Sequence, residues 1–244
     1  MRVPVLLLIV AGCAGTRPTA IERYFDDGPA VLVKSVRLPD SEPWLARFSS
    51  HTFFDLRTRT GGPWMRLEVL SRTSGVRVVP LEPDEVFADR RWDRRVEVLA
   101  SRTGAGAAPM ARKLLDLGIA QNQRYLSSYR AWPGPNSNTF AEGLLREVDG
   151  LGARLDHNAV GKDWAVPVRV GLTGSGAGVE LETPIFGLEL GVVEGVQAHI
   201  LGAAFGIGIV PPALQLPFLP PLRLATRAQV GVSAAGDVSF ETPR

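Results

Sequence analysis

Residues 51–71 read HTFFDLRTRTGGPWMRLEVLS, two stretches of alternating apolar and polar side chains on either side of a Gly61-Gly62-Pro63 turn. Alternation with a period of two places successive side chains on opposite faces of a strand, and glycine followed by proline ends a strand. The segment therefore predicts two antiparallel strands, at residues 51–58 and 64–71, in a sheet with one buried face.

Three further segments rich in β-branched residues are predicted to complete this sheet: residues 30–38, 75–81 and 95–100. Two main helices follow them. The first covers residues 110–118, whose leucines recur at helical spacing and whose last residue is a glycine, a typical helix end. The second covers residues 139–149. The fold class predicted for residues 28–166 is therefore α+β, an antiparallel sheet with two main helices.

The segment between the two helices, residues 125–132, is expected to be extended. After residue 167 the composition changes, and glycine and proline become frequent. A hairpin is predicted at residues 168–172 and 179–183, and short strands are predicted at 186–193, 196–201 and 203–209.

Residues 167–244 are thus expected to form a Gly/Pro-rich β extension packed on the core. The run 185–224 is unusually apolar for an exposed appendage. It has three alternative roles: packing on the first domain, lying against lipid, or binding an apolar partner. Packing is the most frequent outcome for such a segment.

The first thirteen residues resemble a lipoprotein signal. Arg2 precedes an apolar run that is too short to span the ~30 Å of a bilayer core as a helix. The run ends at Val10-Ala11-Gly12-Cys13, which resembles the bacterial lipobox. This resemblance implies cleavage before Cys13 and acylation of that residue, with residues 14–27 as a tether. Alanine, not aspartate, follows the cysteine at position 14, and by resemblance to enterobacterial lipoprotein sorting this favours the outer membrane over the inner one.

Composition excludes several other classes. The chain has 244 residues, and its 27 basic and 25 acidic side chains give a formal net charge of +2, which argues against nucleic acid as a partner. One cysteine and three histidines leave little material for an internal disulfide or a metal cluster. We therefore expect no cofactor and no metal.

The start of the second helix carries the residues with the best prospects for chemistry. A nucleophile at a helix N-terminus gains from the macrodipole and from free backbone amides that form an oxyanion hole. Ser137 is placed for that role, with the backbone of Asn138 as part of the hole. His51, on a neighbouring strand, would take the proton of the hydroxyl. Asp55 is the nearest candidate to orient His51.

A structural alternative explains the same residues. Thr139 and Glu142 have the spacing of a capping box, and Asn136, Ser137 and Asn138 are typical turn residues. His51 would then be a hydrogen-bonded histidine at a strand start. Gly161-Lys162-Asp163-Trp164 lacks the glycine spacing of a phosphate loop and predicts a turn with a surface Lys–Asp pair.

The order of histidine before nucleophile is similar to the circularly permuted papain-like group, which includes NlpC-type peptidases and lecithin retinol acyltransferase relatives. Those proteins have Asn-Cys-x-x-Phe at the helix start, and this chain has Asn136-Ser137-Asn138-Thr139-Phe140. The resemblance implies a permuted papain-like core. Serine in place of cysteine needs a better placed base, so the resemblance also allows an inactive binding descendant.

The chain from about Val31 to Leu224 also resembles an uncharacterised bacterial family, a domain of unknown function. This resemblance rests on residues 132–140 (WPGPNSNTF), 160–164, 186–195, 201–206 and 211–217. It implies that the Ser137 motif and the glycine-rich C-terminal part belong to one unit. It implies no particular activity.

Together these observations predict a lipid-anchored envelope protein facing the periplasm, with two alternative functions. One is a hydrolase or acyltransferase acting on an envelope amide or ester through Ser137 and His51. The other is a non-catalytic binding or scaffolding lipoprotein whose apolar C-terminal region meets a protein or lipid. An enzyme requires His51 beside Ser137 in an open cleft.

Overall fold

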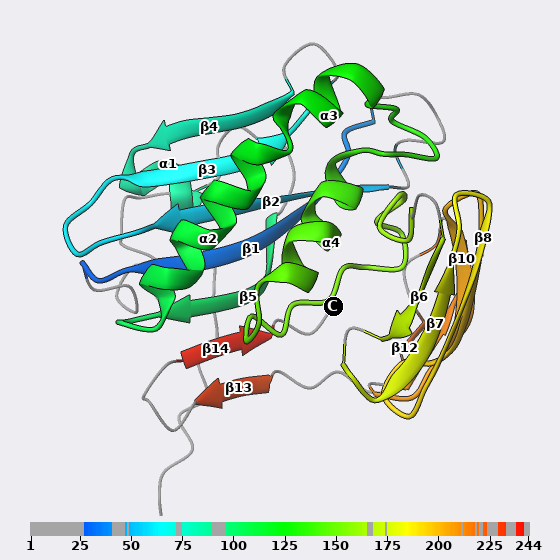
Figure 1. Cartoon of the computed structure of the whole chain (residues 1–244). Coiled ribbons are helices and arrows are strands. Elements are labelled where there is room, and N and C mark those ends of the chain that lie inside the picture. Colours follow the sequence, from blue (N-terminus) through cyan, green and yellow to red (C-terminus); the bar gives the residue numbers. More distant parts are fainter. Residues whose placement is uncertain are drawn as a thin grey trace, which may run out of the picture.

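The computed structural model describes residues 27–40, 47, 49–71, 75–88, 96–164, 168–173, 175–210, 212–217, 219, 222–223, 229–232 and 238–241 (Figure 1). The predicted α+β class is confirmed, with an antiparallel sheet and helices followed by a C-terminal all-β sheet. Cys13 and most of the predicted tether lie outside the described residues. Within the described part of the chain, no helix is long and apolar enough to cross a bilayer.

The first sheet has five antiparallel strands in the order β4-β3-β2-β1-β5. Each predicted strand is present: β1 (Ala30–Arg37), β2 (Ser50–Arg57), β3 (Trp64–Val69), β4 (Val76–Leu81) and β5 (Val96–Thr103). Alternation in β2 sends Phe54 and Leu56 to one face and Phe53 and Asp55 to the other.

The main core lies on the face of Phe54 and Leu56, under α2 (Ala107–Ala120), α3 (Asn122–Ser128) and α4 (Ser137–Glu147) (Figure 1). Leu114 of α2 and Phe140 and Leu144 of α4 are fully buried in this cluster. A short helix that the sequence did not indicate, α1 (Pro83–Ala88), contributes Val86 to a smaller cluster on the opposite face.

Three helix predictions need correction. Gly118 lies inside α2 instead of ending it, because its missing side chain lets the helix approach Leu67 and Phe140 closely. Residues 122–128, predicted partly extended, form α3, which buries Tyr125 against Phe140. The helix predicted at residues 139–149 begins two residues earlier, at Ser137, because Asn136 is its cap.

The second sheet has seven antiparallel strands in the order β12-β11-β10-β9-β8-β7-β6 and stands beside α4 (Figure 1). Its strands are β6 (Arg169–Leu172), β7 (Gly178–Glu182), β8 (Phe186–Gly191), β9 (Gly195–Ile200), β10 (Ala203–Gly208), β11 (Ala213–Gln215) and β12 (Leu222–Arg223). The predicted hairpin and the three predicted short strands are therefore confirmed. A last hairpin, β13 (Gln229–Val232) and β14 (Val238–Glu241), lies beside β5.

Candidate functional site

The WPGPNSNTF segment forms the N-terminal cap of α4. The side chain of Asn136 accepts hydrogen bonds from the backbone amides of Asn138 and Thr139, at 2.9 and 3.2 Å. Thr139 Oγ1 accepts from the backbone amide of Asn136 at 3.1 Å, which completes a capping box. The predicted box between Thr139 and Glu142 is thus wrong, and Glu142 instead forms an ion pair with Arg146.

Asn138 connects this cap to the first sheet. Its Nδ2 donates to the carbonyl oxygens of Ser50 and Val160, at 2.8 and 3.0 Å. Its Oδ1 accepts from Thr52 Oγ1 at 2.9 Å. All three bonds are made by a side chain that is 1% exposed. Asn138 therefore joins the start of β2, the start of α4 and the turn at Val160.

The turn at residues 160–161 is fixed by the same residues. Asn136 Nδ2 donates to Val160 O, and Thr139 Oγ1 donates to Gly161 O at 2.6 Å. Gly161 has a φ of +91°, and a Cβ there would lie 2.5 Å from Asn136 Nδ2. Only glycine fits this turn without displacing Asn136.

The structure does not bring Ser137 and His51 together. Ser137 lies in the first turn of α4, on the helix side of the first sheet, where its hydroxyl makes no hydrogen bond to a described residue. His51 precedes Thr52, which contacts α4, so strand alternation turns the imidazole to the opposite face. There it stacks on Phe53 and lies 3.2 Å from Glu68 Oε2.

The other two predicted contributors are engaged elsewhere. The backbone amide of Asn138, expected in an oxyanion hole, is bound to the Asn136 side chain. Asp55 binds Arg66 with both oxygens and forms an ion pair with Lys34 at 2.9 Å. Asp55, Arg66 and Lys34 form a buried charged network on the far face of the first sheet.

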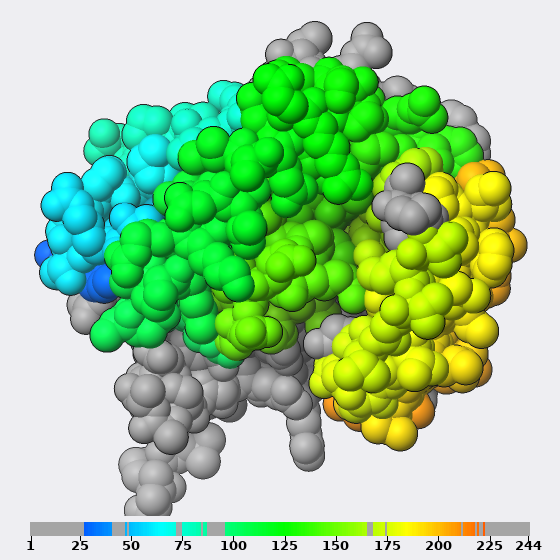
Figure 2. Space-filling model, in the orientation of Figure 1, coloured from blue at the N-terminus to red at the C-terminus, as the bar shows by residue number. Residues whose placement is uncertain are grey.

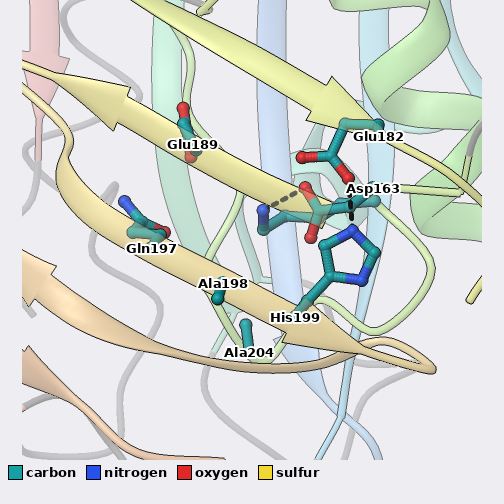
Figure 3. Close-up of a pocket in the computed structure, with 8 residues that line it drawn as sticks. Asp163, Glu182, Glu189, Gln197, Ala198, His199 and Ala204 are labelled. Atoms are coloured by element: carbon teal, nitrogen blue, oxygen red, sulfur yellow. Dashed lines mark hydrogen bonds and ion pairs between the residues drawn. The ribbon is translucent and has the colours of Figure 1, made fainter. Parts of the chain in front are cut away.

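A second charged cluster lies between the turn after α4 and the second sheet, and sequence analysis missed most of it (Figure 3). Lys162 forms an ion pair with Asp163. Glu182 on β7 points to His199 on β9, and the two side chains are hydrogen-bonded. The Lys–Asp pair was predicted on the surface, but the second sheet covers it. The space left among these residues is about 10 Å³, room for one water molecule.

Gly187 permits the Glu182–His199 contact, because it pairs with both residues in the sheet and a Cβ there would lie within 2.2 Å of each side chain. Burial raises the pKa of Glu182, an effect that the hydrogen bond from His199 partly offsets. Burial lowers the pKa of Lys162, but the charges of Asp163 and Glu189 raise it by more, so the pKa of Lys162 is raised overall. Lys162 therefore stays a cation inside this interface.

The face of the second sheet that carries this cluster is bound to the core by ion pairs. Arg146 of α4 binds Glu180 with two parallel bonds of 2.8 and 2.9 Å, and Arg169 reaches the same carboxylate. Arg154 pairs with Glu194. We call this surface the inner face. Its signal in the sequence is the spacing Glu180-Leu-Glu182, which puts two carboxylates on one side of a strand.

The opposite surface, the outer apolar face, is built from the alternate residues of the same strands. Cross-strand pairing aligns one apolar side chain from each of the seven strands in a single row: Leu172, Val179, Leu190, Val196, Ile207, Leu214 and Leu222. A neighbouring row holds Val170, Leu188 and Phe205, and Phe186 and Ile200 pair at the edge. All twelve are exposed, up to 76% for Val170.

The expected packing of the extension on the core is therefore made by its inner face. Figure 2 shows the second sheet, in yellow to orange, along one side of the molecule. The outer apolar face is turned away from α4, since Arg146 holds the other face. Scattered exposed aliphatic residues are normal, but a contiguous apolar surface across seven strands is of the kind that is typical of interaction sites.

The sequence profile of a family of proteins of unknown function, DUF3750, matches residues 32–164, more than half of the chain. The chain belongs to the DUF3750 family. The match includes the WPGPNSNTF segment and ends at Trp164, so the second sheet lies beyond it. No curated protein and no solved structure matches the chain.

In this DUF3750 protein we predict that Asn138→Ala destabilises the fold far more than Ser137→Ala. Asn138→Ala removes three buried hydrogen bonds and takes away the acceptor of the buried Thr52 hydroxyl, a loss of about 2–4 kcal/mol in the free energy of unfolding. Ser137→Ala removes no hydrogen bond to a described residue and deletes only one hydroxyl, so its loss should stay below about 1 kcal/mol. Urea unfolding measures both, and equal losses would contradict the structural role of Asn138.

Glu189 predicts a pH dependence of stability. Burial raises the pKa of Glu189 above 4.5, and the charge of Lys162 only partly offsets this. The carboxyl group therefore ionises less readily in the folded protein than in the unfolded chain, and its ionisation lowers the free energy of unfolding as the pH rises above the unfolded pKa. Glu189→Gln should raise the free energy of unfolding at pH 7–8, with a difference that shrinks toward pH 4. Thermal melts across this range measure it.

Glu194→Gln is the matched control with the opposite sign. Burial raises the pKa of Glu194, but hydrogen bonds from Ser175 and the backbone and the charge of Arg154 lower it more. Its ionised form therefore stabilises the fold, and Glu194→Gln should lower stability at pH 7–8. If both variants shift stability in the same direction at every pH, the assignment of the two carboxylates is wrong.

Proposed function

We propose that this protein is a lipid-anchored bacterial envelope protein that acts by binding an apolar partner on its outer apolar face, without catalysis. The observation that carries the proposal is the seven-strand row of exposed aliphatic side chains from Leu172 to Leu222. The anchor would be Cys13, acylated after cleavage of the leader, with the protein in the periplasm, most simply on the outer membrane.

The separation of Ser137 from His51 supports binding over hydrolysis. A serine nucleophile needs a base within hydrogen-bond reach. The His51 imidazole is instead held by Phe53 and Glu68 on the far face of the first sheet. The permuted papain-like relationship, with its hydrolase or acyltransferase activity, is thus the weaker proposal, and an inactive descendant of that group fits the binding proposal.

The ion pairs of the inner face support the proposal from the other side. They satisfy the charged residues of the second sheet within the protein, so the outer apolar face is free of the charges that would keep it solvated. An apolar surface of this extent, left in water, favours association with another apolar surface.

The test uses the mature chain with Cys13→Ser, made without its leader, and the apolar-surface dye bis-ANS. The double variant Val196→Glu with Ile207→Glu should lose most of the dye fluorescence, because both side chains are more than half exposed on the outer face. Ile119→Glu is the matched control, since Ile119 is 55% exposed on α2 and lies outside that face. Circular dichroism checks the fold of each variant.

Equal dye fluorescence in the wild type and in the double variant would contradict a binding role for this face. The anchor is tested separately in bacterial cells, where the wild type should incorporate labelled palmitate. Cys13→Ser should lose the label and leave the membrane fraction. Retention of the label in that variant would contradict acylation at Cys13.

A further inference from the structure

We infer that the occupant of the outer apolar face is the acyl-chain region of a lipid leaflet, so that the second sheet lies against the membrane. This inference rests on the proposed function and names the partner of the same surface. Four observations point to lipid: the side chains of the face, the turns at its ends, the satisfied backbone and charges, and the position of the anchor in the sequence.

The side chains are those of a lipid contact. Among the described residues that point outward from the second sheet, all are Val, Leu, Ile, Phe or Ala, and none carries a hydrogen-bonding group. Protein interfaces form about one hydrogen bond per 100–200 Å² and are enriched in Tyr, Trp, Arg and Met. Hydrocarbon requires no such groups.

Three turns of the second sheet also carry exposed aliphatic side chains. Ile185 lies in the turn between β7 and β8, Val192 between β8 and β9, and Ile209 between β10 and β11, and each is at least half exposed. Turns that face water favour Gly, Pro, Asn, Asp and Ser. Aliphatic residues in these positions add apolar surface at the ends of the strands, as a lipid surface allows.

The backbone and the charges tolerate an apolar environment on this side. Antiparallel pairing through all seven strands satisfies the backbone amides and carbonyls of the interior strands, which hydrocarbon requires. The carboxylates Glu180, Glu182 and Glu194 all lie on the inner face, where Glu180 and Glu194 are paired with arginines and Glu182 is hydrogen-bonded to His199. No described charge of these strands would enter the lipid.

The proposed anchor brings this face to a membrane. Thirteen residues separate Cys13 from Asp27, the first described residue, and an extended chain of that length reaches up to about 45 Å. A tether this short keeps the outer apolar face at a high local concentration beside the leaflet. The sheet would therefore provide a second membrane contact in addition to the acyl chains.

The experiment is flotation of the mature Cys13→Ser chain, which lacks the acyl anchor, with vesicles of phosphatidylethanolamine and phosphatidylglycerol. The wild-type sheet should carry this chain into the vesicle fraction. Val196→Glu with Ile207→Glu should reduce the bound fraction about ten-fold or more, because two carboxylates would have to enter the lipid. Ile119→Glu should float as the unsubstituted chain does.

A second measurement does not depend on charged variants. Phe205→Trp places a fluorophore on the outer apolar face with a change of one aromatic ring for another. Lipids brominated on their acyl chains should quench its added fluorescence in vesicles. Quenching equal to that of the protein with Phe205 would overturn the lipid contact.

Two outcomes overturn the inference and separate it from the proposed function. If the chain does not float and sediments as a dimer that Val196→Glu with Ile207→Glu dissociates, the occupant is a second copy, and the binding role of the face stands. If the chain does not float and is a monomer, lipid is excluded. The bis-ANS comparison then decides whether the face binds an apolar partner at all.

Discussion

The paired hydrogen bonds between Arg146 and Glu180 set the orientation of the second sheet. They fix one side of β7 against α4, and Arg154 with Glu194 and the covered Lys162–Asp163 pair hold the same side of the sheet. Because side chains alternate along a strand, a charged residue on the inner face is followed by an aliphatic residue on the other at Arg169-Val170, Glu180-Leu181 and Glu189-Leu190. The exposed apolar surface is thus a direct consequence of how the inner face binds the core.

The cap of α4 provides the platform for that binding. Asn136 and Asn138 tie the helix start to β2 and to the turn at Val160, and this turn leads directly to Lys162 and Asp163. The WPGPNSNTF segment, which looks like a nucleophile site in the sequence, therefore has a structural explanation for the side chains of Asn136, Asn138, Thr139 and Phe140. Ser137 is the exception, because its hydroxyl makes no hydrogen bond to a described residue. The unit that the DUF3750 profile covers ends where the second sheet begins.

The strands were predictable from the sequence because alternation and turn residues are local signals. The limits of the helices were harder to predict from the sequence. Gly118 is a helix end by local preference, yet contact with Leu67 and Phe140 keeps it inside α2. Residues 122–128 carry no strong pattern, and packing of Tyr125 on Phe140 makes them helical.

The direction in which the second sheet faces was beyond local signals, since alternation defines two faces but not which one meets the core. The same limit applies to His51, because the alternation of β2 does not say which of its two faces meets α4. Thr52 contacts α4, so the neighbouring His51 lies on the opposite face.

The most direct test of this account is the thiol accessibility of two positions on β10, in the mature chain with Cys13→Ser and without lipid. Ile207→Cys lies on the outer apolar face at a position that is 64% exposed, and Ala204→Cys lies on the inner face at a position that is 4% exposed. We expect rapid maleimide labelling of the first and protection of the second until the protein unfolds. Faster labelling of Ala204→Cys than of Ile207→Cys would mean that the sheet faces the other way, and it would contradict both the inner-face ion pairs and the exposed apolar surface.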